Sequence, residues 1–100
     1  MKIVAVTACP TGIAHTYMAA EQLEKTAKKL GHTIKVETQG AMGIENELSQ
    51  AEIDAAEVAI LATDIAIEQA ERFVRIRKVE VPVQAALRDP EAIFKQAQAT

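Results

Sequence analysis

Residues 9–16 combine a candidate nucleophile with side chains that suit an anion-binding loop. Cys9 supplies a nucleophile, and Thr11 and Thr16 supply hydroxyl donors. Gly12 lets the backbone turn without a Cβ beside an anion. The segment joins a short apolar run to a helical pattern, so it leads into a helix N-terminus, whose unpaired N–H groups and about half a positive charge attract phosphate and stabilise a thiolate. The pattern therefore predicts a cysteine nucleophile beside a phosphate-binding loop.

Simpler interpretations of these residues exist. A single cysteine at a strand end is often only a small buried apolar side chain, but Pro, Gly and two Thr around it fill a core poorly, which favours a site. His15 fits two interpretations equally well, either a surface side chain in the first helical turn or a donor to the thiolate or phosphate. Cys9, His15 and His32 match no familiar metal-binding spacing, so neither a metal nor a cofactor is expected.

The rest of the chain predicts alternating strands and helices that position this loop. Two uninterrupted apolar runs are typical of strands covered on both faces, and an alternating run is typical of a half-exposed strand nearer a sheet edge. The expected strands are 3–6, 33–38, 58–62 and one within 74–83, with a flexible loop at 39–43. Helical periodicity and capping patterns predict helices at 17–30, 49–55 and 67–73, and another from Asp89 toward the C-terminus.

This order of elements indicates an α/β fold for residues 1–100 as a single domain. We expect a three-layer sandwich with a four-stranded parallel sheet flanked by helices, of the doubly wound, Rossmann-like kind. Ligands of such sheets bind beyond the carboxyl ends of the strands. Glu37, Gln39 and Asp64 lie at or after the ends of neighbouring strands and are therefore candidate rim residues, although ordinary loop solvation or capping is the simpler interpretation of Glu37 and Asp64.

Composition excludes several classes of function. The 100 residues carry 11 basic and 14 acidic side chains, a formal net charge of −3, which gives no electrostatic case for nucleic acid or an anionic membrane. One cysteine cannot form an intrachain disulfide, which favours a reducing compartment. The longest apolar runs are far shorter than the roughly 20 residues of a membrane span, and the first residues do not form a signal peptide. A cytoplasmic domain without membrane insertion is expected.

The sequence resembles the fructose-type enzyme IIB domains of the bacterial phosphoenolpyruvate-dependent sugar phosphotransferase system. The resemblance rests on residues 9–21 (CPTGIAHTYMAAE), 35–40 (KVETQG), 43–46 (GIEN) and the strand that ends at Asp64, and so covers nearly the whole chain. It implies that Cys9 accepts a phosphoryl group from a phosphohistidine of enzyme IIA. Cys9 would then pass the group to a sugar, fructose by the family's name, that is held by the membrane component, enzyme IIC. The loop holding the phosphate would comprise Pro10, Thr11, Gly12, Ile13, Ala14, His15 and Thr16.

Other functions for a reactive cysteine fit the sequence less well. A cysteine-dependent phosphatase using the same loop is the main alternative, but such enzymes need an Arg six positions after the Cys, where this chain has His15. A mostly neutral imidazole does not replace the bidentate guanidinium clamp, and weaker capture suits a carrier. A redox protein would need a second cysteine, and a pure interaction module would leave the loop composition unexplained.

A cluster of positive charge follows a long acidic stretch. Residues 44–71 contain eight acids and no base, and Arg72, Arg75, Arg77 and Lys78 come directly after them. Solvated faces are the usual explanation of such runs. An alternative hypothesis is that the basic cluster steers an acidic partner toward the domain. The chain also departs from the resemblance between residues 73 and 81, where VRIRKV stands in place of a Gly-Lys turn.

Overall fold

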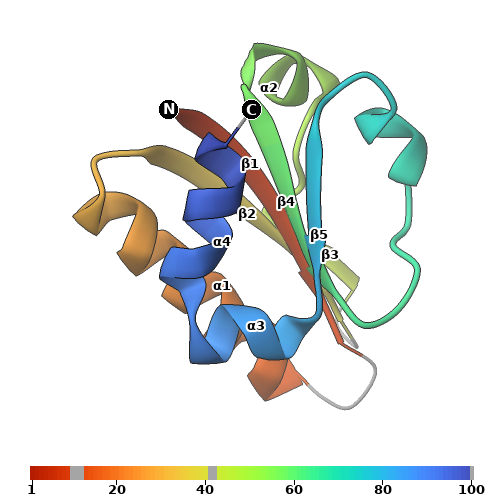
Figure 1. Ribbon diagram of the computed structural model, residues 1–100. Coiled ribbons are helices and arrows are strands. Elements are labelled where there is room, and N and C mark those ends of the chain that lie inside the picture. The colour runs from red at the N-terminus through yellow and green to blue at the C-terminus, as the bar shows by residue number, and fades with distance from the viewer. Residues whose placement is uncertain (10–12, 41–42, 100) are drawn as a thin grey trace.

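A computed structural model describes residues 1–9, 13–40 and 43–99, which form one five-stranded sheet in the order β3-β2-β1-β4-β5 (Figure 1). The parallel strands are β1 (Lys2–Ala8), β2 (Thr33–Gly40), β4 (Val58–Thr63) and β5 (Lys78–Val81). The prediction of a four-stranded parallel sheet is wrong in one respect, because β3 (Gly43–Glu45) adds an antiparallel strand at the edge. Gly43, at a φ of +88°, pairs with Gly40 across the segment expected to be a loop, so the chain turns back onto β2.

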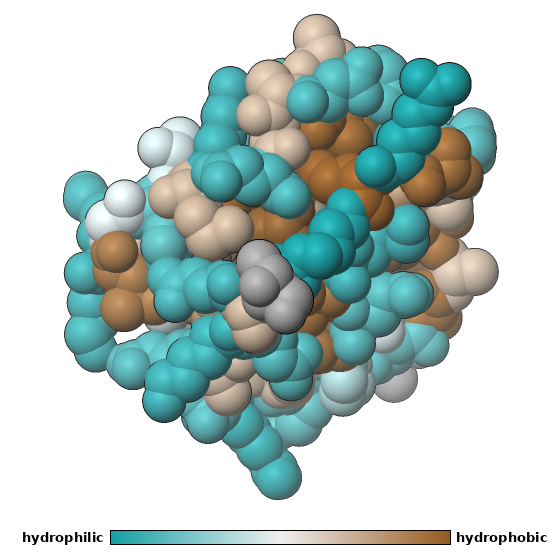
Figure 2. Space-filling view, turned by 45° about the horizontal axis from the view of Figure 1, so that its top comes forward, coloured by the Kyte–Doolittle hydropathy of each residue, from teal (hydrophilic) through white to brown (hydrophobic). Residues whose placement is uncertain are grey.

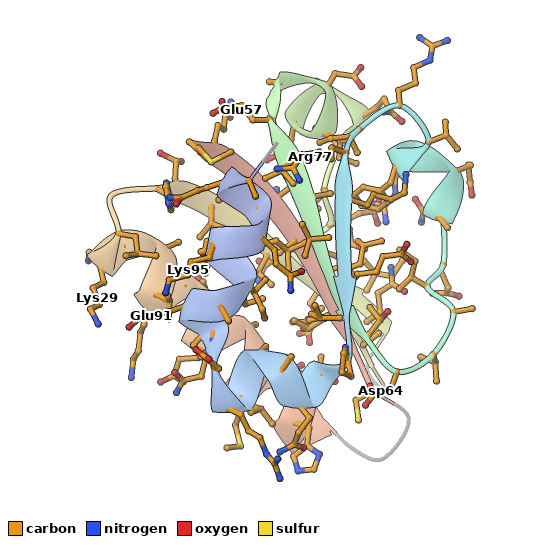
Figure 3. All side chains as sticks on the ribbon, viewed as in Figure 1. Lys29, Glu57, Asp64, Arg77, Glu91 and Lys95 are labelled. Carbon is orange, nitrogen blue, oxygen red and sulfur yellow. The ribbon has the colours of Figure 1, made fainter. Side chains whose placement is uncertain are left out.

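Helical elements cover both faces of this sheet, which confirms the layered α/β arrangement. On one side lie α1 (Ile13–Lys29), α3 (Val83–Arg88) and α4 (Pro90–Gln98), and on the other lie α2 (Gln50–Ala55) and the 3₁₀ turn η1 (Ala70–Phe73) (Figure 1). An exposed ion pair of 2.8 Å between Lys29 Nζ and Glu91 Oε1 links α1 to α4 (Figure 3). In the part of the chain that the structure describes, no helix is both long enough and apolar enough to cross a membrane.

Capping patterns in the sequence correctly predicted where two helices begin. Hydrophobic periodicity predicted the short elements less well. Ser49 and Glu52 form the expected capping box, and Asp89 caps α4 through the Ala92 N–H at 3.3 Å. The helix predicted at 67–73 is only the single turn η1. The strand predicted within 74–83 is confined to β5, because Pro82 ends it and begins α3, a helix that the sequence analysis missed.

The two faces of β1 explain its uninterrupted apolar run. Ile3 and Ala5 belong to the core under α1, α3 and α4, whereas Val4 and Val6 belong to the core under α2 and η1. The expectation that β2 is a half-exposed strand is wrong for its carboxyl half, since residues 36–39 are all buried. On the face in Figure 2, hydrophilic residues cover most of the surface, and apolar residues reach it in patches between them.

Truncating Phe94 tests whether α4 belongs to the cooperative core. Phe94 is 1% exposed, and its ring stacks on His32 at 5.8 Å. We expect Phe94→Ala to lower the free energy of unfolding by about 3–5 kcal/mol, because it removes a buried ring and leaves a cavity. Urea unfolding measures the loss. The matched control is Val74→Ala at a site that is 72% exposed, with an expected change within about 0.5 kcal/mol. Equal losses in the two variants would contradict this assignment.

Candidate functional site

Cys9 lies between the carboxyl end of β1 and the amino end of α1. It follows Ala8, the last residue of the strand, and α1 begins at Ile13. Pro10, Thr11 and Gly12, predicted to form the loop, lie outside the described residues, as do the side chains of Ile13 and Ala14. Cys9 is 7% exposed and belongs to the core on the α1 side, so it is largely enclosed.

Three buried threonines lie on the strands and helix next to Cys9. Thr7, Thr16 and Thr38 are at most 4% exposed, and Thr7 and Thr38 are opposite one another on β1 and β2. The Thr7 hydroxyl donates to the Thr16 carbonyl at 3.0 Å, which fixes the first turn of α1 on the end of β1. Among the described residues, the hydroxyls of Thr16 and Thr38 have no hydrogen-bond partner. The sequence analysis named Thr16 but missed Thr7 and Thr38, which can be recognised only as polar residues ending two neighbouring strands. His15, by contrast, is exposed.

Asp64 is the candidate rim residue that the structure brings beside Cys9. Its N–H donates to the Ala8 carbonyl at 3.0 Å, directly before Cys9 in the chain. Its carboxylate accepts the Val83 N–H at 3.1 Å, at the start of α3. Figure 3 shows Asp64 at the end of the sheet where α3 begins. The carboxylate therefore caps α3 and remains exposed at the same edge as the cysteine.

Glu37 lies on the opposite face of the sheet, away from Cys9. Alternation along β2 turns it toward η1, where it is 0% exposed, and loop solvation is therefore the wrong interpretation of this residue. Arg72 holds both carboxylate oxygens, with Nη1 at 2.8 Å from Oε1 and Nη2 at 2.9 Å from Oε2. The Leu48 N–H also donates to Oε1 at 2.8 Å, and Gln39 Nε2 donates to Oε2 at 2.7 Å. The carboxylate is thus fully partnered inside the protein.

Gln39 lies on this same face and holds a second segment. Its Nε2 donates to the Glu68 carbonyl at 3.1 Å, and its Oε1 accepts the Glu68 N–H at 2.8 Å. Arg72 adds bonds to the carbonyls of Leu48 at 2.8 Å and Gln69 at 3.0 Å. The structure therefore does not bring Glu37 and Gln39 to the rim beside Cys9. They tie the segment after Asp64, and the start of α2, to the back of the sheet.

Electrostatics stabilises the ionised form of Glu37 in spite of its burial. Burial alone would raise the pKa of this carboxyl, but hydrogen bonds from Arg72, the Leu48 N–H and Gln39, together with the Arg72 charge, hold its pKa below the usual range. The same pair raises the pKa of Arg72. Both groups therefore stay charged near neutral pH, and each neutralises the other in a water-poor environment.

The structure disperses the basic cluster expected at residues 72–78. Arg72 is buried with Glu37, and Arg77 donates to the carbonyls of Gln96 and Ala97 at the end of α4. Lys78 Nζ donates to the carbonyl of Phe73 at 2.9 Å. Three of the four cations therefore bind their own chain, which removes most of the basis for a continuous docking patch.

Fold and site together define an α/β domain with a cysteine between the first strand and the first helix. A family model described as "PTS system, Lactose/Cellobiose specific IIB subunit" matches residues 4–96. The chain therefore belongs to the enzyme IIB family of the sugar phosphotransferase system.

Relatives and solved structures agree with this membership. The chain is 49% identical over 98 residues to the fructose-like EIIB component 2 of Escherichia coli K12, covering 98% of this chain and 92% of that protein. It is 52% identical over 95 residues to the 2-O-alpha-mannosyl-D-glycerate-specific EIIABC component of the same strain, covering 95% of this chain but 14% of that longer protein. A domain of the fructose-specific IIABC component of Borrelia burgdorferi superposes with a TM-score of 0.91 at 51% identity, covering 96% and 91% of the two chains.

These comparisons decide between the functions left open by the sequence. An enzyme IIB domain is a phosphotransferase of the sugar phosphotransferase system, so the predicted carrier class is confirmed. The resemblance identified from residues 9–21, 35–40, 43–46 and the strand that ends at Asp64 is confirmed as well. Membership in this family favours the carrier over the cysteine-dependent phosphatase.

The Glu37–Arg72 pair predicts a stability that depends on pH. We expect Glu37→Gln to lower the free energy of unfolding by about 3–5 kcal/mol near neutral pH, because it leaves the Arg72 charge buried and unpaired. The folded pKa of Glu37 is depressed, so its contribution is complete above the ordinary value of about 4.3 and is lost as pH falls through the folded value. Urea unfolding at several pH values should show that the difference in free energy of unfolding between wild type and Glu37→Gln becomes smaller in acid.

Two further variants serve as controls for this experiment. Glu21→Gln removes an exposed partner of Lys25 and should change stability little at any pH. The double variant Glu37→Leu with Arg72→Met should recover much of the stability that Glu37→Gln loses, because no buried charge remains. A gap of constant size from neutral to acidic pH would show that the ionised carboxylate is not the stabilising form.

Proposed function

We propose that Cys9 is the phosphoryl-accepting residue of this enzyme IIB domain. The main observation in support is its position, directly after β1 and before the N-terminus of α1, a 17-residue helix. The helix dipole and unpaired N–H groups of the first turn favour an anion there, both as thiolate and as phosphorylated sulfur. Phosphoryl transfer requires mainly positioning and charge stabilisation, so a loop of backbone amides is adequate for it.

The phosphoryl group travels in two displacement steps. The Cys9 sulfur attacks the phosphorus of a phosphohistidine on enzyme IIA, the S–P bond forms and the N–P bond breaks. The electron pair of that bond stays on the imidazole nitrogen. The thiol loses one proton, and the imidazole takes up one proton. In the second step a sugar hydroxyl forms an O–P bond, the S–P bond breaks, and its electron pair returns to the sulfur while the hydroxyl proton is released.

We assign phosphate binding to the loop and to the first turn of α1. The residues are Pro10, Thr11, Gly12, Ile13, Ala14, His15 and Thr16. In support, the buried Thr16 hydroxyl has no partner among the described residues, which leaves its hydrogen available to a phosphoryl oxygen. The exposed His15 lies in this turn and is assigned an outer position.

We propose the partners and the sugar from the family rather than from this chain alone. Enzyme IIA is the proposed donor, and membrane enzyme IIC with bound sugar is the proposed acceptor. Homologous domains joined to other components in EIIABC and EIIBC proteins of Escherichia coli K12 support this pairing. Fructose is the proposed sugar because several relatives are named fructose-like or fructose-specific. One relative is named for 2-O-alpha-mannosyl-D-glycerate, and the family model's description names lactose and cellobiose. Residues 1–100 are proposed to work as one cytoplasmic domain.

Intact-mass spectrometry tests the nucleophile. After incubation with phosphoenolpyruvate, the general phosphoryl-donor proteins and a cognate enzyme IIA, wild type should gain one phosphoryl group that maps to Cys9. Cys9→Ser should gain none, because an alcohol is a far weaker nucleophile near neutral pH. Membranes containing enzyme IIC and sugar should discharge the wild-type adduct. Turnover of a simple phosphoester that disappears in Cys9→Ser, without a stable adduct, would instead support the phosphatase.

A further inference from the structure

A carboxylate lies next to the cysteine that is proposed to carry a phosphoryl group. Asp64 directly follows β4, as Cys9 directly follows β1, and both strands end at the same edge of the sheet. A negative group in that place is unexpected for simple anion binding, since it repels both a thiolate and a phosphoryl group.

The strand register brings the two residues side by side. Ala8 pairs with Thr63, and the Asp64 N–H donates to the Ala8 carbonyl at 3.0 Å, so the parallel ladder continues by one step past the last pair. Cys9 and Asp64 therefore occupy opposite positions directly after two neighbouring strands, and parallel sheets separate such strands by about 4.8 Å.

Both side chains also point to the same face of the sheet. Cys9 belongs to the core on the α1 side, together with Ala62 of β4. Asp64 follows Ala62 by two residues, so alternation turns it to that face as well. Its bond to the Val83 N–H at the start of α3 gives independent support, because α3 packs on the same side.

The hydrogen bond from Val83 fixes the carboxylate without neutralising its charge. A backbone N–H carries only a partial positive charge. None of the ion pairs among the described residues includes Asp64. The negative charge is therefore held at the carboxyl end of the sheet, where it acts on whatever the cysteine carries.

We propose that Asp64 raises the phosphoryl-transfer potential of phosphorylated Cys9 by charge repulsion, an inference that rests on the proposed role of Cys9. A phosphorylated sulfur carries about two negative charges and a thiolate one, so the carboxylate destabilises the phosphorylated form more. The domain then releases the phosphoryl group to a sugar hydroxyl more readily. Asp64 is not a catalytic residue, because it acts on the phosphoryl group only through its charge.

The test compares the phosphoryl-transfer equilibrium of wild type and Asp64→Asn. The amide oxygen of the variant can still accept the Val83 N–H, so the cap of α3 remains while the charge is removed. Isolated phosphorylated enzyme IIA is mixed with an equal amount of the domain, and intact-mass spectrometry gives the phosphorylated fraction of each protein at equilibrium. We expect the equilibrium constant to favour the phosphorylated variant by about three- to tenfold, and added salt to reduce the difference.

Glu57→Gln is the matched control. Glu57 precedes β4, at the opposite end from Asp64 in Figure 3, and its carboxylate also accepts a backbone N–H, that of Lys2 at 2.9 Å. The net charge of the domain changes equally in both variants, so only a local effect separates them, and Glu57→Gln should match wild type. Asp64→Glu keeps the negative charge, so its equilibrium constant should lie close to that of wild type.

Each outcome bears on a separate claim. Wild type phosphorylated on Cys9, with Asp64→Asn at the same equilibrium position, would overturn the role of Asp64 and leave that of Cys9 intact. If Asp64→Asn is less stable in urea and its shift in the equilibrium constant does not depend on salt, Asp64 acts only as the cap of α3. That result would also overturn the proposal. Wild type that gains no phosphoryl group on Cys9 would overturn both the proposed function and this inference.

Discussion

The buried ion pair between Glu37 and Arg72 organises the half of the molecule that short elements alone could not hold. On that face α2 has six residues and η1 four, too few to pack firmly by themselves. The pair anchors both, because Glu37 accepts the Leu48 N–H before α2 and Arg72 belongs to η1. Its two charges are separated by 35 positions in the chain, so the contact also joins β2 to the segment that follows β4. One pair of opposite charges therefore links three segments of this face, above the apolar core that Val4, Val6 and Phe73 help to form.

The residues that anchor the short elements lie on one face of the sheet, and the proposed phosphoryl-accepting cysteine lies on the other. Glu37, Gln39 and Arg72 meet on the face of α2 and η1, whereas Cys9, Thr16 and Asp64 belong to the side of α1 and α3. Gln39 links the two faces, since its side chain is hydrogen-bonded to the backbone of Glu68, four residues after Asp64. The carboxyl end of β4 is thereby supported from behind, at the same edge of the sheet as Cys9.

Local patterns in the sequence were sufficient for some of these features and insufficient for others. The cysteine before the first helix, the capping box at Ser49 and the cap at Asp89 depend on neighbouring residues, so they could be predicted. Arg72 looked like part of a basic surface because its partner is distant in sequence. Glu37 sits in an alternating strand that is equally typical of a solvated face, and the partners found where it is buried include Leu48 and Arg72, 11 and 35 positions away in the chain. Long-range partners and short elements were therefore the features missed.

The two edge strands of the sheet affect how the domain self-associates at high concentration. The outer strands are short, three residues in β3 and four in β5, and each carries charged side chains, Glu45 on one and Lys78 and Glu80 on the other. Pro82 directly follows β5 and cannot donate a backbone hydrogen bond. Long, flat and uncharged edge strands act as templates for intermolecular β-sheet growth, whereas these two edge strands are short and charged. The domain is thus protected against fibrillar self-association while the interior of its sheet remains strongly apolar.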